Sequence, residues 1–365
     1  MRKILMGLSA AALMVTALAG PIAAQETVDT STMTIAEIVT SMSSAETPEF
    51  TALMGAIGIA DPAVAAALAD PDSQLTVFAP TDAAFAALAE AMGADVVAAL
   101  LADSELVTRI LQYHVVSFPL TSEVIVDSVT GLVDQGAPAG LTYSRPTLQG
   151  GYLDFYATET GVRVDKANIV LESSDIPASN GVIHVIDAVL LPELRTIGEI
   201  VSASATSETP QFTVLLAALD ALGLTETVLD PEANITVFAP TDAAFAAAFE
   251  ALGVTAEDVL ADTELLASIV TFHVVPGTVH SFDLGLALFL PADPAVELPA
   301  WNGGVDASAA TPTLLLNTAN GAQLSFLLGE TRFPMINNAN IIGNDLDAAN
   351  GVIHVIDAVL LPPLE

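Results

Sequence analysis

An internal repeat limits what this chain can fold into more than any other feature of the sequence. Residues 76–87 read TVFAPTDAAFAA, and the same twelve residues return at 236–247. A second phrase, NGVIHVIDAVLLP, occupies 180–192 and recurs at 350–362. Because each copy of the first phrase is followed by one copy of the second, the chain contains two tandem units of one fold.

A third motif lies between the two phrases of each unit. It reads Tyr-His-Val-Val at 113–116 in the first unit and Phe-His-Val-Val at 272–275 in the second. Together the three motifs resemble the fasciclin (FAS1) domain, and the resemblance runs from about Thr34 to Pro362. It implies an α+β fold of two tandem FAS1-like domains, each a β-sandwich-like wedge flanked by helices. We expect the first domain at 34–194 and the second at 195–365.

The local patterns also predict an α+β fold. Thr34 and Glu37 have the spacing of a helix capping box, and Thr196 and Glu199 repeat it. Thr47-Pro48 and Thr209-Pro210 have the form of a cap followed by proline, so we expect a second helix to begin there in each unit. Further helices are expected at 94–101 and 104–112.

A strand is expected at 75–79, and the residues that follow it begin a helix. Thr81 or Asp82, like Thr241 or Asp242, stands between the strand and an alanine-rich run, which is typical of a helix N-cap and not of a catalytic carboxylate.

The second half of the first unit is rich in short β-type runs. We expect strands at 124–129, 152–157, 162–164 and 169–171. Helices in the first half and strands in the second favour α+β over alternating βαβ units. Only residues 193–195 separate the two units, which predicts a restricted mutual orientation.

The N-terminal segment is typical of a secretory signal peptide. Residues 1–24 carry Arg2 and Lys3, an apolar run and small residues before the first acid, Glu26. A polar leader at 25–33 then precedes the first domain. We therefore expect an exported protein, in the periplasm, at the cell surface or outside the cell. No later segment has the length and composition of a membrane span.

The chain is strongly acidic, with 44 Asp and Glu against 8 Lys and Arg and a formal net charge of -36. This excludes nucleic acid as a partner, because phosphate binding needs basic residues that the chain lacks. We interpret the acidity as an adaptation to a salty medium, which suggests a marine or halophilic bacterium.

No catalytic, cofactor or metal motif is found in the sequence. The chain has no cysteine, no Gly-x-Ser-x-Gly, no His-Glu-x-x-His and no phosphate-binding loop, and 345–356 fails the pattern of a calcium loop. His184 and Asp187 point to opposite faces of a strand, so they do not form a dyad. We expect the histidines of the repeated motifs to be structural, with no cofactor and no metal, and the protein to be a binding protein and not an enzyme.

The resemblance to FAS1 implies adhesion or binding to extracellular matrix, so an extracellular protein or polysaccharide surface is the expected partner. The segments that bind ligands in animal members correspond to eight residues of this chain, namely Tyr113, His114, Asp175 and Ile176 in the first unit and Phe272, His273, Asp345 and Leu346 in the second. The alternative is a secreted or periplasmic binder of a small apolar ligand or polysaccharide. The only tryptophan, Trp301, would serve that alternative if its indole lined a cleft, and burial against its own domain is the other interpretation.

Overall fold

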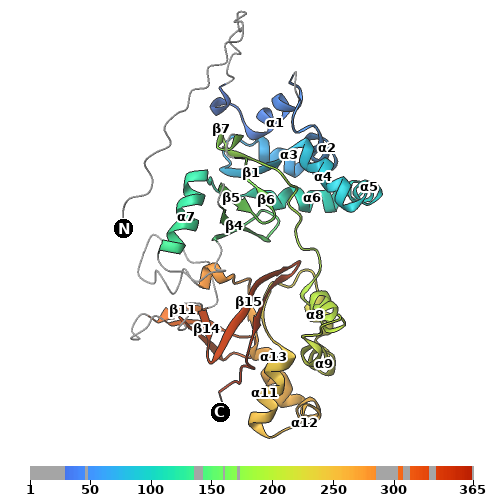
Figure 1. Cartoon of the computed structure of the whole chain (residues 1–365), viewed down its shortest axis with the longest axis vertical. Helices are drawn as coiled ribbons and strands as arrows, with labels where there is room; N and C mark the ends of the chain where they lie inside the picture. Colours follow the sequence, from blue (N-terminus) through green and yellow to red (C-terminus); the bar gives the residue numbers. More distant parts are fainter. Residues whose placement is uncertain are drawn as a thin grey trace, which may run out of the picture.

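The two units lie one above the other along the long axis of the molecule, with most helices of the first unit gathered toward one end (Figure 1). The structure, a computed structural model, describes residues 29–45, 48–134, 143–158, 161–170, 173–284, 303–306, 313–328 and 334–363. Helices dominate the first half of each unit and strands the second half. The chain is therefore α+β, as the sequence predicts.

The helices of the first unit are η1 (Thr30–Thr32), α1 (Ile35–Ser43), α2 (Thr51–Ile59), α3 (Pro62–Ala69), α4 (Asp82–Met92), α5 (Ala94–Leu101), α6 (Ser104–Tyr113) and α7 (Ser122–Asp134). Its strands are β1 (Leu75–Pro80), β2 (Val115–Val116), β3 (Tyr143–Pro146), β4 (Tyr152–Thr158), β5 (Gly161–Val164), β6 (Ala167–Asn168), β7 (Ile176–Ala178) and β8 (Gly181–Ile186).

The helices of the second unit are α8 (Ile197–Ala205), α9 (Thr213–Leu222), α10 (Thr225–Leu229), α11 (Asp242–Leu252), α12 (Ala256–Ala261) and α13 (Thr263–Phe272). Its strands are β9 (Ile235–Pro240), β10 (Val274–Pro276), β11 (Gly303–Asp306), β12 (Thr313–Asn317), β13 (Gln323–Leu328), β14 (Pro334–Ile336), β15 (Ala339–Ala348) and β16 (Gly351–Ile356).

The two repeated phrases of each unit are neighbours in space. Strand β1 pairs in parallel with β8, and Phe78 lies opposite His184. Strand β9 pairs in the same way with β16, and Phe238 lies opposite His354. The first unit has two four-stranded sheets, ordered β2-β1-β8-β7 and β3-β4-β5-β6, whereas the second unit joins the equivalent strands into one eight-stranded sheet.

A glycine permits this parallel pairing in each unit. A side chain on Gly181 would place its Cβ 1.9 Å from the carbonyl oxygen of Leu75, and one on Gly351 would lie 1.8 Å from that of Ile235. Both glycines also have positive φ, at 151° and 145°, which disfavours any side chain. The Asn-Gly of the second phrase is thus required by the close approach of the strands.

Each unit has two hydrophobic clusters, one under its helices and one between its sheet layers. The second cluster of the first unit contains Phe78, Leu153 and Phe155, and it also contains Phe282 from the second unit. The two units therefore share buried apolar surface.

Several predicted elements are confirmed. Both capping boxes are formed, at Thr34 with Glu37 and at Thr196 with Glu199. The helix expected at 94–101 is α5, and the strand expected at 152–157 is β4.

Three expectations for secondary structure were wrong. Residues 124–129 belong to helix α7 and not to a strand. The helices expected at Thr47-Pro48 and Thr209-Pro210 begin at Thr51 and Thr213, because their first amides bond to Asp82 and Asp242. Residues 169–170 of the strand expected at 169–171 form only an isolated bridge at Ile169, and residue 171 lies outside the described residues.

Candidate functional site

The aromatic-His motif of each unit is buried at a helix-to-strand corner. His114 follows α6, its Nδ1 donates to the carbonyl of Ile110 at 2.7 Å, and its Nε2 accepts from the amide of Leu190 at 3.0 Å. His273 makes the same two bonds in the second unit, with Ile269 at 2.8 Å and Leu360 at 2.9 Å. Each ring thus joins the end of a helix to the end of its unit.

Burial lowers the pKa of both rings to about 4, although the backbone bonds oppose this shift. Both histidines are therefore neutral near pH 7, which agrees with their bonding, since one ring nitrogen donates and the other accepts.

The aromatic residue before each histidine is also buried. The hydroxyl of Tyr113 lies 2.8 Å from the carbonyl oxygen of Tyr152 and 2.9 Å from Oδ2 of Asp165. Phe272, at the matching position, is buried without such bonds. These two residues and their histidines thus contact the interior of their own units.

The aspartates of the second predicted segment point inward to a serine. Asp175 accepts from the amide of Ser122 at 2.7 Å and from its hydroxyl. Asp345 makes the same contacts with Ser281. Both aspartates have positive φ, at 55° and 52°. The two serines were not singled out from the sequence, because they lie 53 and 64 residues from their partners.

A histidine completes each of these clusters, but not as a catalytic triad. The amide of Asp175 lies 3.4 Å from Nδ1 of His184, whose Nε2 donates to the carbonyl of Leu120 at 2.6 Å. His354 bonds in the same way to Asp345 and Val279. The serine hydroxyl contacts the carboxylate and both ring nitrogens are already engaged, so neither ring can act as base toward the serine.

The residues after the two aspartates differ in exposure, and Ile176 packs against the helical core of the first unit. Ile176 is half-buried, whereas the Leu346 side chain is 41% exposed. Ile342, on the same strand β15, is 58% exposed. Strand β15 of the second unit thus exposes two apolar side chains, one of them directly after Asp345.

A charged cluster fills the boundary between the units. The ring of His280 stacks on Tyr152 of the first unit, with centroids 3.6 Å apart. Its Nδ1 lies 3.4 Å from Asp345 and its Nε2 lies 3.4 Å from Asp347. Beside it, Phe282 meets Tyr143 edge to face at 5.3 Å.

A polar cavity of about 160 Å³ opens beside this cluster. It is lined from the first unit by residues 149–152 and from the second by Asn234, Thr278, His280, Asp347 and residues 348–351.

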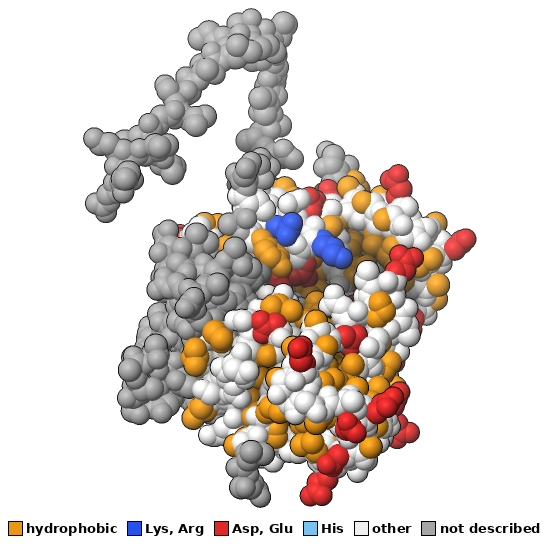
Figure 2. Space-filling view, turned by 60° about the horizontal axis from the view of Figure 1, so that its bottom comes forward, with side chains coloured by type: hydrophobic (Ala, Val, Ile, Leu, Met, Phe, Trp, Pro, Cys, Tyr) orange, Lys and Arg blue, Asp and Glu red, His pale blue; other side chains and the backbone are white. Residues whose placement is uncertain are grey.

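Figure 2 shows one face of the molecule, on which acidic side chains are spread widely and the visible basic side chains gather beside a hollow.

Comparison with known proteins identifies the fold family. The family model of the fasciclin domain matches residues 48–192 and 210–362. The chain belongs to the fasciclin family. The two units are thus tandem fasciclin domains, and their exact boundaries stay a prediction.

Several fasciclin relatives are similar to parts of this chain. Protein sll1483 of Synechocystis is 36% identical over 167 residues, which are 45% of this chain and 74% of that protein. Human periostin is 24% identical over 318 residues, or 86% of this chain and 30% of periostin. The cell surface glycolipoprotein MPT83 of Mycobacterium tuberculosis is 29% identical over 172 residues, or 45% of this chain and 61% of that protein.

A solved structure also matches the chain. It is a FAS1 domain pair from the insect cell adhesion molecule fasciclin I, which covers 88% of this chain and 98% of its own at 17% identity, with a TM-score of 0.34.

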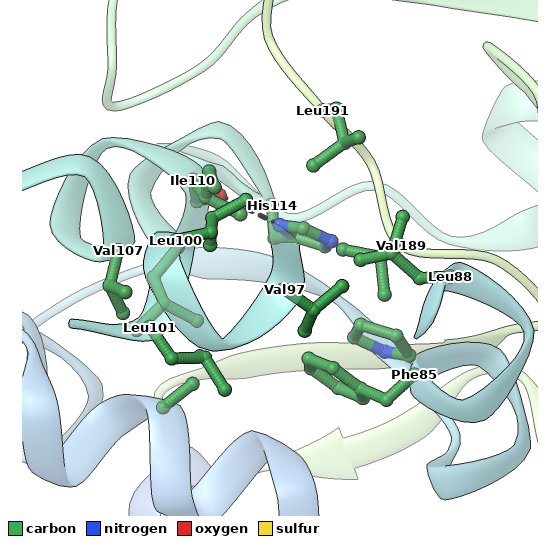
Figure 3. A pocket seen from close by; sticks show the side chains of 13 residues that line it. Phe85, Leu88, Val97, Leu100, Leu101, Val107, Ile110, His114, Val189 and Leu191 are labelled. Atoms are coloured by element: carbon green, nitrogen blue, oxygen red, sulfur yellow. Dashed lines mark hydrogen bonds between the residues drawn. The ribbon is translucent and has the colours of Figure 1, made fainter. Parts of the chain in front are cut away.

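An apolar pocket lies in the first fasciclin domain, between α4, α5, α6 and the closing segment at 189–191 (Figure 3). Phe85, Val97 and Leu100 point into it, and His114 lies at its wall. Its volume of about 30 Å³ is close to the space that one water molecule takes up. Trp301, the residue named for the small-ligand alternative, lies outside the described residues.

The described residues also bear on metal binding and on membrane insertion. In the described part of the chain, no group of three or more His, Asp and Glu could hold a metal ion. Within the same ranges, no single helix is long and apolar enough to cross a membrane, although α4 and α5, bent by 116°, pass that test as a pair.

Proposed function

We propose that this protein is an exported, non-enzymatic adhesion module that binds an extracellular protein or polysaccharide surface. The family membership supports a binding role, and relatives that carry fasciclin domains include a cell surface glycolipoprotein. The signal-like segment at 1–24 supports export.

The observation that carries the proposal is the exposure of apolar side chains on strand β15, close in sequence to the inward-pointing Asp345. Asp345 bonds to Ser281, and Leu346, which follows it, is exposed, as is Ile342 on the same strand. A pair of exposed apolar side chains on a rigid strand can bury surface against a partner at little cost in ordering. We therefore assign the partner contact to Leu346 and Ile342 in the second domain and to Ile176 in the first, with the aspartates as supports.

The burial of Tyr113, His114, Phe272 and His273 gives these residues a supporting part in the proposal. They hold the end of the sheet in place, and a partner would meet the surface above them. In the described residues, neither Ser122 nor Ser281 contacts a histidine ring nitrogen, which supports a role without catalysis.

Replacing Leu346 and Ile342 by serine tests the proposal. Each exposed side chain should contribute about 1 kcal/mol to binding, so either variant should bind about fivefold more weakly to envelopes of the host's own cells. The measurement is a sedimentation assay with purified protein at several concentrations, together with an unfolding midpoint for each variant.

The control is Leu252→Ser, which removes a leucine that is 55% exposed at the end of α11. It should bind like the parent protein. The assignment is wrong if Leu346→Ser and Ile342→Ser stay folded and bind as well as Leu252→Ser.

A further inference from the structure

The charged cluster at the domain boundary belongs to the second domain alone. His184 donates to the carbonyl of Leu120, and the equivalent His354 donates to the carbonyl of Val279. Leu120 and Val279 therefore occupy matching positions in the two domains. Counting from them, Thr121 and Val124 of the first domain match His280 and Asp283 of the second. Counting from Asp175 and Asp345, which bond to the same two histidines, Pro177 matches Asp347. The shared fold does not need these charges, because the first domain forms without them.

The His280 ring is held by charge rather than by hydrogen bonds. It is only 1% exposed, and within the described residues neither ring nitrogen has a hydrogen bond of good geometry, since the nearest carboxyl oxygens lie 3.4 Å away. A neutral ring would leave both nitrogens buried and unsatisfied, which is costly. An imidazolium instead directs an N-H toward a carboxyl oxygen on each side, at 3.4 Å from Asp345 and from Asp347.

The first domain supplies a receiving face that is not repeated. Tyr152 stacks on His280, while Tyr143 and Arg145 contact Phe282, with the Arg145 guanidinium 4.9 Å above its ring. Alignment through the strand partners Phe155 and Phe326 places Leu314, Leu316 and Gln323 at the matching positions of the second domain. The aromatic face is therefore found only on the first domain and the charged face only on the second, so two copies of the same domain could not form this interface.

We propose that the protonated ring of His280 locks the second domain onto the first, and that this lock opens as the pH rises. The lock consists of the stacked Tyr152, the imidazolium and the flanking carboxyl groups of Asp345 and Asp347. The titratable and charged groups around it are Asp345 and Asp347 of β15, His354 of β16, Asp283 beside it in the chain, Arg145 of β3, Tyr152 and Asp154 of β4, Asp165 after β5 and Tyr113 of α6.

The pKa values of His280, Asp347 and Asp283 are all raised above their ordinary values. Burial lowers the pKa of His280, but Asp345, Asp347 and Asp283 outweigh burial and raise it to about 9. Burial raises the pKa of Asp347 to about 8 and that of Asp283 to about 6. All three groups bind protons more tightly in the closed arrangement than when exposed to water.

Because these groups bind protons more tightly when the domains are closed, closure becomes less favourable as the pH rises. The contribution of His280 to closure is fully present below its ordinary pKa of 6.5 and is lost as the pH rises through about 9. Asp347 and Asp283 also favour closure at lower pH. Asp345 has the opposite shift, with its pKa held well below the usual range, so it stays charged throughout this window.

Titration of the histidine rings by NMR provides the first test. The chain has five histidines, and comparison with His280→Thr assigns the resonance of His280. That ring should be protonated at pH 7 and titrate near pH 9, and Asp347→Asn should move its pKa downward. A ring that is neutral at pH 7 in the intact protein would overturn the proposal.

Small-angle scattering of the full chain provides the second test, at constant ionic strength from pH 6 to pH 10. The radius of gyration should increase over this range for the parent protein. His280→Thr, which introduces the residue of the first domain, should be expanded already at pH 6 and change little. Circular dichroism checks that both domains of this variant stay folded.

Matched ring variants complete the test. Tyr152→Ala removes the stacked ring and should behave like His280→Thr, whereas Gln323→Ala, at the matching position of the second domain, should behave like the parent protein. If the radius of the parent protein does not change with pH, or if His280→Thr follows the same curve, the lock does not exist.

Discussion

His114 shows what a buried histidine does for this fold at the scale of one residue. Its ring joins the end of α6 to the amide of Leu190, and burial lowers its pKa to about 4. Because the unfolded chain binds a proton at about pH 6.5, stability falls as the pH decreases from 6.5 toward 4. The effect for one such group is on the order of 3 kcal/mol.

We expect His114→Gln to lower the free energy of unfolding at pH 7 by roughly 2 kcal/mol, because two buried hydrogen bonds are lost or weakened. It should also reduce the loss of stability between pH 7 and pH 4.5, since glutamine does not titrate. Urea unfolding at several pH values measures both effects. His273→Gln should repeat the result in the second domain, and an unchanged pH dependence in both variants would show that neither ring is held neutral.

His280 could not be identified from the repeat, because it lies outside the shared phrases. The residues that the two units have in common include His114 and His184, whose rings are buried and bonded to backbone carbonyls. The charged cluster instead depends on a position where the two units differ, which holds Thr121 in the first unit and His280 in the second. Only the packing of one domain on the other explains that difference.

At the scale of elements, Asp82 starts a helix that is distant in sequence. Thr81 caps α4 through the amide of Ala84. The carboxylate of Asp82 instead bonds to the amide and hydroxyl of Thr51 and to the amide of Ala52, at the start of α2. Asp242 does the same for α9 with Thr213 and Val214. The sequence motif therefore caps two helices and not one.

This geometry predicts that Asp82→Asn is not neutral. An amide keeps one acceptor oxygen but directs its NH2 toward the Thr51 amide, so the variant should lose on the order of 1 kcal/mol of stability, and Asp82→Ala about 1 to 2 kcal/mol. Chemical denaturation measures the loss. Asp72→Asn, in an exposed turn, is the matched control, and equal midpoints for Asp82→Asn and Asp72→Asn would refute the second cap.

Helix α7 illustrates where local propensity fails. Residues 124–129 read VIVDSV, which favours a strand by composition. In the structure, Ile125 and Val129 lie one turn apart and pack into the core of the first domain, while Asp175 and Thr121 bond to the first amides of the helix. These partners come from distant or preceding segments, so the tertiary contacts outweigh the local preference. Capping boxes and the paired strands were predictable because their signals are local or repeated.

At the scale of the whole molecule, the two domains share a fold but differ at the faces where they meet. The parallel strand pair, the glycine at its start and the Ser-Asp-His cluster occur twice. The aromatic face of the first domain and the charged face of the second occur once. A duplicated sequence thus gives two equivalent cores and one asymmetric interface, which fits the restricted orientation expected from the short connection.

The acidic surface leads to a prediction for the whole chain. Removal of residues 1–24 would take away Arg2 and Lys3 and no acid, so the net charge would fall from -36 to about -38. Folding concentrates these charges, and their repulsion lowers stability most where screening is weak. At about 0.01 M salt the Debye length is about 30 Å, so acids of both domains interact, whereas at about 1 M it is about 3 Å.

Stability should therefore rise with sodium chloride between these two concentrations. Sulfate should stabilise the protein further than chloride at equal ionic strength, because it also strengthens the burial of apolar surface. The measurement is the urea midpoint of the processed chain at fixed pH 7, where the His280 lock is closed. A neutral osmolyte such as sucrose, which does not screen charge, is the control for general stabilisation. A midpoint that stays flat or falls from 0.01 M to 1 M sodium chloride would contradict adaptation to a salty medium, since repulsion among the acids would then contribute nothing to the balance.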